Sequence, residues 1–403
     1  MNAPATAPRG TGILPSQSLR AMIARGEIAA DPAIDEAQIQ SASIDLRLGT
    51  VAYRVPASFL PGPAATVADK LAGLSMHEID LTGGAVLEKG CVYIVQVLEQ
   101  VDLPARVSGT ANPKSSTGRL DIFTRLISDR AVEFESVPAG YQGPLYTEIS
   151  PRTFSILVRT GSRLNQLRLR LGRPAISDSA MRRLQDQVGL VHGDRIDIRE
   201  GVAVSVDLER DDGLIGYRAK PHAGLIDIDR PGAYPVDGFW EPIRRPRSGL
   251  AGLILNPDEF YILASKEFVT VPLDHAAEMR AYDTRVGEFR VHYAGFFDPG
   301  FGHDAAGGSG SRAVLEVRAH DVPYLIEDGQ IVCRLVYEPL TEVPDKLSGA
   351  GGIGSNYQAQ GLKLSKHFQM TGESPRYLTF ATAGWKLSGF QKAARKGRAA
   401  GIC

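Results

Sequence analysis

The chain has 403 residues, and its formal net charge at pH 7 is −1. The length predicts two domains with extensions, and 43 glycines and 25 prolines favour a turn-rich β protein over a helical one. The balanced charge argues against non-specific nucleic-acid binding, and the lack of a long apolar run predicts a soluble, cytoplasmic protein with no membrane partner.

The period of the apolar residues changes along the chain. Residues 1–12 are rich in Ala, Pro, Gly and Thr and are expected to be mobile. A short helix should follow, capped by Ser16 and stopped by Gly26, because its apolar residues are spaced three and four apart. From about residue 40 the period becomes two, and short Gly/Pro turns separate the predicted strands. This pattern is typical of a β-barrel or a β-sandwich.

A repeat runs through the chain. Four features recur in the same order at offsets of 162, 168, 166 and 168 residues: Ser43-Ile44-Asp45-Leu46 with Ser205-Val206-Asp207-Leu208, Tyr93 with Tyr261, Arg119 with Arg285, and Glu148 with Glu316. Ordered matches at a nearly constant offset indicate a duplicated unit. A helical pattern interrupts the strands between the two copies. We therefore predict a first barrel at 13–172, a helical linker at 173–195, a second barrel at 196–345, and a Gly-rich arm with a basic tail at 346–403.

The segment from Lys114 to Arg119 carries two serines, a threonine and a glycine between two predicted strands. Hydroxyl and backbone donors with an Arg fork can hold phosphate oxygens. The spacing differs from that of a Walker loop. A polar surface turn is the alternative interpretation.

Glu148 and Glu316 each lie in a predicted strand, and Glu316 has apolar residues on both sides. A buried carboxylate must be paired or must shift its pKa, and a Glu that titrates near neutral pH can act as a general base toward water. The alternative is a Glu on the solvent face of an edge strand. Recurrence at equivalent positions favours the functional interpretation.

Metal chemistry has little support in the sequence. The three cysteines form no CxxC pair, and the eight histidines show no ligand spacing. The zinc nucleobase deaminases need an HxE motif with PCxxC, which is absent here. We therefore predict no metal-ligating residues and no zinc.

These motifs together resemble the dCTP deaminases of the trimeric dUTPase-like superfamily, over roughly residues 13–170 and 200–365. The resemblance rests on the following segments: Ile13-Leu14-Pro15-Ser16, Ser41 to Gly49, Lys114-Ser115-Ser116 with Arg119, Gly140-Tyr141-Gln142-Gly143 with Glu148, Asp298 to Phe301 with Glu316, and the C-terminal Tyr357 and Gln360.

The resemblance implies a mainly β chain of two tandem dUTPase-like distorted barrels, jelly-roll-like, with a few short helices. It implies hydrolysis of dCTP to dUTP and ammonia by a Glu general base without zinc, which would supply dUMP and dTTP synthesis. Mg²⁺ would accompany the triphosphate. Arg119 and Ser115 would position water and base, and a hairpin carbonyl, at Ser128 or Ala294, would bind the exocyclic amine.

The departures from the family pattern predict a composite site. Family members are normally single barrels, and the second copy has Ala281 and Tyr282 where the Ser pair belongs. We expect the two copies to contribute different parts of one site: Ser115, Ser116 and Arg119 from the first, and the Ala294 hairpin, Glu316, Tyr357 and Gln360 from the second. Arg285 is either useful there or structural. A site that uses Glu148 and Arg285 would be vestigial.

Two other functions stay open from the sequence. Asp129 in the first hairpin could orient a water at the α-phosphate, which would make the chain a dUTPase or a bifunctional deaminase and dUTPase. The second copy lacks the Ser pair of the phosphate-binding segment, which also suits a non-catalytic deoxynucleotide sensor. The family resemblance further implies a homo-oligomer and dTTP as a possible inhibitor.

Overall fold

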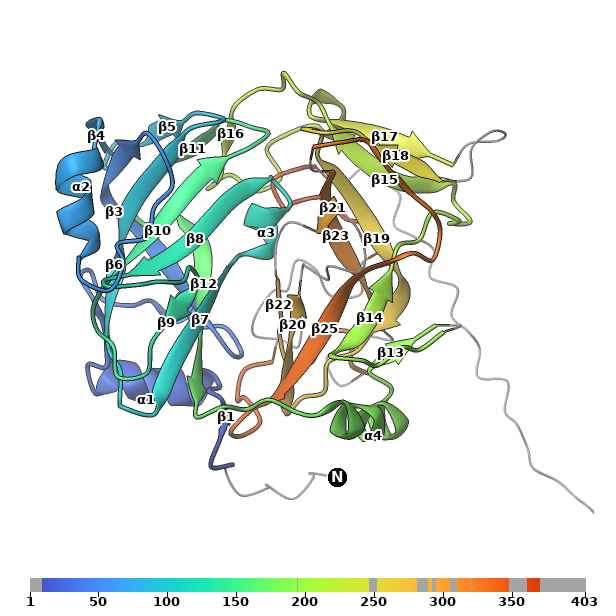
Figure 1. Cartoon of the computed structure of the whole chain (residues 1–403), viewed down its shortest axis with the longest axis horizontal. Coiled ribbons are helices and arrows are strands. Elements are labelled where there is room, and N and C mark those ends of the chain that lie inside the picture. Colours follow the sequence, from blue (N-terminus) through green and yellow to red (C-terminus); the bar gives the residue numbers. More distant parts are fainter. Residues whose placement is uncertain are drawn as a thin grey trace, which may run out of the picture. The chain divides into compact units, whose positions relative to one another are not determined.

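The structure is a computed structural model in which strands predominate (Figure 1). It describes residues 9–193, 195–245, 252–280, 289–291, 295–304, 310–319, 321–347 and 361–369. The α-helices among these residues are short, the longest having 11 residues. No helix of the described part is both long and apolar enough to cross a membrane. The prediction of a mainly β chain with a few short helices is confirmed.

Most strands of the first half of the chain belong to one large sheet, and its helices are short. Its elements are β1 (Gly12–Ile13), α1 (Ser16–Ala24), β2 (Ile28–Ala30), η1 (Glu36–Gln38), β3 (Ile44–Val55), α2 (Val67–Leu74), β4 (His77–Asp80), β5 (Ala85–Leu87), β6 (Val92–Asp102), β7 (Val107–Pro113), α3 (Ser115–Gly118), β8 (Ile122–Ser128), β9 (Ser136–Val137), β10 (Gln142–Pro151), β11 (Ile156–Val158) and β12 (Arg163–Leu171). The strand order is β8-β10-β6-β3-β12-β7-β9, and β1, β2 and β4 pair outside this path.

The second half follows helix α4 (Asp178–Val188), which lies in the predicted linker. Its elements are β13 (Val191–His192), β14 (Val202–Ser205), β15 (Leu214–Ala219), β16 (Ile226–Asp227), η2 (Val236–Gly238), β17 (Trp240–Arg244), β18 (Leu253–Leu255), β19 (Tyr261–Val269), β20 (His275–Arg280), β21 (Phe289–Val291), β22 (Phe296–Phe297), β23 (Ser311–Ala319), β24 (Tyr324–Ile326) and β25 (Ile331–Pro339). They form sheets β17-β15-β19-β23-β21 and β14-β25-β20-β22, with β18 paired to β24 and β13 to β19. Strand β16 instead joins β11 and β5 of the first half in a three-stranded sheet.

Strand pairing shows the duplication directly. In the first half β10 lies between β6 and β8, and in the second half β23 lies between β19 and β21. Glu148 of β10 is opposite Ile94 of β6, and Glu316 of β23 is opposite Ile262 of β19. Both pairs differ by 168 residues, so the two glutamates occupy equivalent places in equivalent strands.

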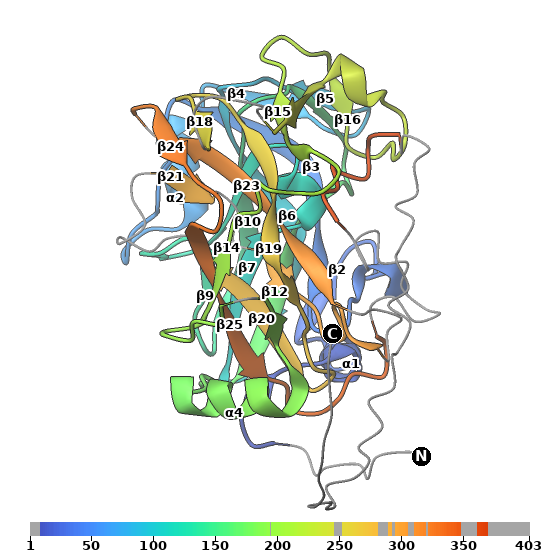
Figure 2. The same cartoon turned by 90° about the vertical axis from the view of Figure 1, so that its right-hand side faces the viewer.

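Helix α1 shows one correction to the sequence prediction. Pro15, not Ser16, occupies the N-cap position, and Ser16 is the first helical residue. The Ser16 hydroxyl donates to the Asp345 carboxylate instead of capping the helix. The predicted stop is confirmed, because Gly26 follows the helix with a left-handed φ of 77° and its N–H bonds to the Ile23 carbonyl. In both views α1 and α4 lie at the same end of the described part (Figure 2).

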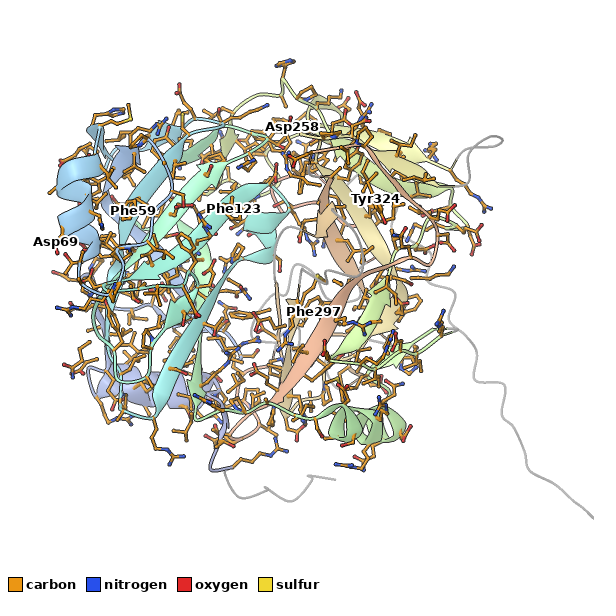
Figure 3. All side chains as sticks on the ribbon, in the orientation of Figure 1. Phe59, Asp69, Phe123, Asp258, Phe297 and Tyr324 are labelled. Atoms are coloured by element: carbon orange, nitrogen blue, oxygen red, sulfur yellow. The ribbon has the colours of Figure 1, made fainter. Side chains whose placement is uncertain are left out.

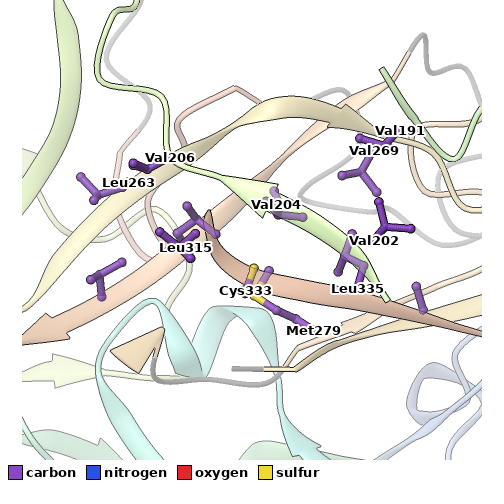
Figure 4. Close-up of a cluster of buried hydrophobic side chains, with 14 of the residues drawn as sticks. Val191, Val202, Val204, Val206, Leu263, Val269, Met279, Leu315, Cys333 and Leu335 are labelled. Atoms are coloured by element: carbon purple, nitrogen blue, oxygen red, sulfur yellow. The ribbon is translucent and has the colours of Figure 1, made fainter. Parts of the chain in front are cut away.

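Each half has its own apolar core. The core of the second half packs inward-facing side chains of β14, β19, β20, β23 and β25, including the fully buried Cys333 (Figure 4). In the first half, α1 buries Leu19 and Met22 against β2, β6 and β12. A further cluster combines residues of both halves, such as Phe154 and Trp240, whose rings are 5.7 Å apart. The described residues up to Gln369 consequently form one compact unit.

A buried arginine also joins the halves. Arg168 of β12 is fully buried, and its guanidinium carbon lies 3.9 Å from the centroid of the Phe296 ring. The guanidinium donates to the Ala277 carbonyl at 3.0 Å and reaches Asp298 at 3.4 Å. Figure 3 draws the side chains of both halves on the ribbon and labels Phe123 of β8 in the first half and Phe297 of β22 in the second. The strands that carry the predicted site residues therefore belong to one packed body.

Candidate active site

Helix α3 forms most of the predicted phosphate segment. Lys114 is its extended N-cap residue, and its ammonium pairs with Asp45 of β3. Thr117 donates to the Leu164 carbonyl at 2.9 Å, which ties the turn to β12. Ser115 is partly exposed and Ser116 is buried. This attachment holds the turn rigidly at the end of β7 and leaves Ser115 accessible.

Arg119 and Glu316 meet across the two halves. Arg119 follows α3 in the first half, and Glu316 lies in β23 of the second. The distance between Arg119 Nε and Glu316 Oε1 is 3.8 Å, and both side chains are less than one tenth exposed. Arg119 also donates to the Lys363 carbonyl at 3.0 Å. The structure thus brings together two residues that the sequence assigned to one composite site.

Burial raises the pKa of Glu316 to about 8, because a charged carboxylate is poorly solvated there. The nearby Arg119 guanidinium opposes this shift, and the negative charge of Asp121 adds to it. A carboxyl with this pKa is present in both protonation states near neutral pH. It can therefore accept a proton from water and return it during one reaction.

The same pKa predicts a pH-dependent stability. Glu316 ionises near pH 8 when folded, against an ordinary value of 4.5. A raised folded pKa favours the protonated native state, so the contribution to stability is lost as pH rises from about 5 to 8, by up to about 1.4 kcal/mol per pH unit. Glu316→Gln should remove this slope. Urea unfolding of both proteins at pH 5, 6.5 and 8 measures it, and parallel stability curves would contradict the assignment.

The C-terminal strap, residues 361–369, lies in the arm predicted at 346–403, but the sequence analysis named none of its residues. Ser365 donates from its hydroxyl to the Ser116 carbonyl at 2.8 Å. His367 lies 2.8 Å from that hydroxyl through Nδ1 and 2.8 Å from the Ile228 carbonyl through Nε2. Burial lowers the pKa of His367 to about 4, so the ring is neutral at pH 7. The strap therefore joins the second half to the α3 turn of the first.

The strap also adds positive charge beside α3. Burial lowers the pKa of Lys363, and the Arg119 charge lowers it further. Burial lowers the pKa of Lys366 as well, and among the charged groups Lys114 lowers it most. Cations that depress one another's pKa in a buried place are stabilised by an anion. These lysines, with Lys114 and Arg119, suit a polyphosphate.

The first-half carboxylates have other partners. Glu148 is buried and pairs with Arg125 of β8 at 2.7 Å, and the Arg125 guanidinium lies 3.5 Å from the Phe134 ring centroid. Asp129 accepts a hydrogen bond at 2.8 Å from the Val67 N–H, the first residue of α2. Ser128 ends β8 and is fully buried. These groups are thus engaged within the first half.

Four predicted site residues lie outside the residues that the structure describes: Arg285, Ala294, Tyr357 and Gln360. Their predicted roles stay predictions. Within the described ranges, no group of three or more His, Cys, Asp and Glu side chains is arranged to hold a metal ion.

Two family models match the chain in succession. The N-terminal domain of 2'-deoxycytidine 5'-triphosphate deaminase matches residues 10–173, and its C-terminal domain matches residues 177–368. The crystal structure of 2'-deoxycytidine 5'-triphosphate deaminase from Agrobacterium tumefaciens is 56% identical, with a TM-score of 0.78. That match covers 82% of this chain and 100% of the other. The predicted fold class is confirmed by this likeness.

Curated relatives match more locally. The dCTP deaminase of Actinobacillus succinogenes is 30% identical over 131 residues, which are 30% of this chain and 64% of the relative. The dUMP-forming dCTP deaminase of Methanobrevibacter smithii is 33% identical over 110 residues, which are 27% of this chain and 53% of the relative. The chain thus spans less than two thirds of the length of either relative. From the two domain matches and the Agrobacterium structure together, the chain belongs to the dCTP deaminase family.

Proposed function

We propose that this chain hydrolyses dCTP, bound as its magnesium complex, to dUTP and ammonia, with Glu316 as the general base. The observation that carries the proposal is the buried Glu316 carboxyl beside Arg119 of the other half, in a chain of this family. Burial raises the pKa of Glu316 to about 8, which suits proton transfer near neutral pH.

Arg119 and Glu316 can hold the nucleophilic water together. At 3.8 Å, Nε and Oε1 are too far apart for a direct hydrogen bond. A water molecule beside the pair can donate to the carboxylate and accept from the guanidinium. Arg119 is itself held by the Lys363 carbonyl at 3.0 Å. The two side chains therefore orient one water toward the base of the nucleotide.

The reaction then needs Glu316 to carry two protons in turn. Glu316 takes the first proton from the water as the water oxygen bonds to C4 of cytosine, and it passes this proton to N3. Glu316 next carries the second proton of that oxygen to the amino group. The C4–N bond breaks, ammonia leaves, and the C4 carbonyl of uracil forms. One water is consumed and one ammonia is released, so no oxidant or reductant is required.

The triphosphate is assigned to the cationic group beside α3. Lys363 and Lys366 supply positive charge beside Lys114, whose ammonium also pairs with Asp45, and Ser115 supplies an accessible hydroxyl. Burial depresses the pKa of both strap lysines. An anionic ligand reverses such a shift and is bound tightly in return. This arrangement favours a nucleoside triphosphate over a nucleoside.

Hydrolysis of dUTP by the same chain is the second candidate, since the Methanobrevibacter relative is a dUMP-forming enzyme. In the dUTPase hypothesis Asp129 orients a water at the α-phosphate. In this chain the Asp129 carboxylate accepts from the Val67 N–H at 2.8 Å and so holds the start of α2. That engagement favours deamination without cleavage of the triphosphate.

Incubation of the purified chain with dCTP and Mg²⁺ tests the proposal. Nucleotides are separated, and ammonia and pyrophosphate are measured, with and without a zinc chelator. We expect dUTP and ammonia in equal amounts, unchanged by the chelator, and no pyrophosphate. Pyrophosphate and dUMP would establish the bifunctional alternative. Binding of dCTP without any product would contradict the proposal and indicate a sensor.

A further inference from the structure

We propose that Asp121 and Arg318 form a positioning pair that holds Arg119 and Glu316 at their working distance. This inference rests on the proposed function. Asp121 follows Arg119 by two residues in the first half, and Arg318 follows Glu316 by two residues in β23. Residues two apart on a strand share a face, so Arg318 projects from the same side of β23 as Glu316.

Asp121 and Arg318 belong to a buried hydrogen-bond network that also includes Thr153. Arg318 Nε donates to both Asp121 oxygens, at 3.2 and 3.1 Å. Arg318 Nη2 donates to the Asp121 carboxylate and also to the Thr153 hydroxyl at 2.9 Å. Thr153 donates in turn to Asp121 at 2.5 Å. Asp121 is fully buried, and the other two are less than one tenth exposed. The bidentate geometry fixes orientation as well as distance.

The backbone at Asp121 is adapted to this contact. Its φ is 56°, in the left-handed region that non-glycine residues seldom adopt. Its N–H bonds to the Gly118 carbonyl at 2.8 Å, and its carbonyl accepts from the Arg152 N–H at 2.9 Å. The turn after α3 is thereby fixed on both sides of the carboxylate. A shift of β23 would have to break the pair before it separated Glu316 from Arg119.

The duplicated unit has no second copy of this pair. By the repeat offsets of 168 and 166 residues, the positions equivalent to Arg318 and Asp121 are Ser150 and Gly287. A serine and a glycine cannot form an ion pair. The pair thus marks the Glu316 site and not the Glu148 site. The ion pair is independent of the α3 serines as an observation, and both indicate that the site at Glu316 is the active one.

Asp121 acts on Glu316 electrostatically as well as by holding its position. Its charge raises the pKa of Glu316, in addition to the larger effect of burial. Asp121→Asn keeps the shape of the side chain and removes the charge. The variant should therefore lower the pKa of Glu316 and move the rise of kcat with pH to lower pH. A purely structural residue would not move this profile.

The experiment compares Asp121→Asn, Arg318→Gln and Arg318→Lys with the wild type. We expect kcat for dCTP to fall by about tenfold to a hundredfold in the first two, with KM changed by less than about threefold, as for lost alignment. Arg318→Lys should recover part of kcat. Ser150→Ala, at the equivalent place in the first half, is the control and should keep wild-type kcat.

A fourth variant tests the proposal even if the single variants do not fold. Asp121→Asn combined with Arg318→Gln leaves no buried unpaired charge and should fold better than either single variant, while its kcat stays low. If the single variants fold and keep both the wild-type kcat and the wild-type pH profile, the proposed positioning role of the pair is wrong. Inactive wild type would overturn the proposed function instead. In that event, a stability slope that ends at a lower pH in folded Asp121→Asn than in the wild type would still support the contact, because the variant lowers the pKa of Glu316 without removing the effect of burial.

Discussion

Replacing Glu316 with Gln should reduce the proposed turnover of dCTP by about 10²–10⁴-fold, as removal of a general base does. The amide keeps the size of the side chain but cannot accept a proton from water. Binding of dCTP should change little, because the cationic residues that we propose for the triphosphate are untouched. Initial rates of ammonia release and equilibrium binding of dCTP measure the two effects separately.

Glu148→Gln is the matched control for this prediction. Glu148 occupies the equivalent place in β10, but it pairs with Arg125 at 2.7 Å. The variant should lose stability, because it leaves Arg125 without its carboxylate partner, by about 1–3 kcal/mol. Activity per folded molecule should remain within about threefold of wild type. Loss of turnover in Glu148→Gln, with turnover retained in Glu316→Gln, would reverse the assignment of the two sites.

Replacing Arg119 with Ala should reduce kcat/KM by about 10²–10³-fold, the usual cost of one preorganised donor. Arg119 faces Glu316 at 3.8 Å and donates to the Lys363 carbonyl at 3.0 Å. Its loss removes a donor to the water and an anchor of the strap, so both kcat and KM should worsen. Steady-state kinetics across dCTP concentration separates these effects.

Arg125→Gln is the control for the arginine prediction, since Arg125 is the partner of Glu148 in the first half. Its guanidinium lies over the Phe134 ring and contributes to packing there. The change should lower stability and leave kcat/KM per folded molecule unaltered. Equal losses of activity in the Arg119 and Arg125 variants would mean that both repeated sites work.

The fold could be predicted because its signals are local. Period-two alternation and Gly/Pro turns indicate strands without knowledge of their partners. The duplication could be predicted from ordered offsets, and it led to the pairing of Arg119 with Glu316 across the halves. The cap of α1 was mispredicted because Ser16 has a tertiary partner, Asp345, 329 residues away. Sequence spacing alone does not reveal such a competitor.

The missed parts of the site depend on long-range contacts. Ser365 reaches Ser116 over 249 residues, and Arg318 reaches Asp121 over 197. Neither residue type is unusual at its position in the sequence. The one available signal was the alternation of Lys363, Ser365 and His367 after Gly361, which is short and follows a Gly-rich arm. Asp129 likewise became a partner of α2 only through folding.

The central claim is that Arg119 and Glu316, from opposite halves, act on one nucleotide. A double-mutant cycle on kcat/KM for dCTP tests it most directly, with Arg119→Ala, Glu316→Gln and the combined variant. Residues that act as a unit are strongly non-additive. We therefore predict that the combined variant loses no more than about tenfold beyond Glu316→Gln alone. Losses that multiply in full would show that the two residues act independently and would contradict the composite site.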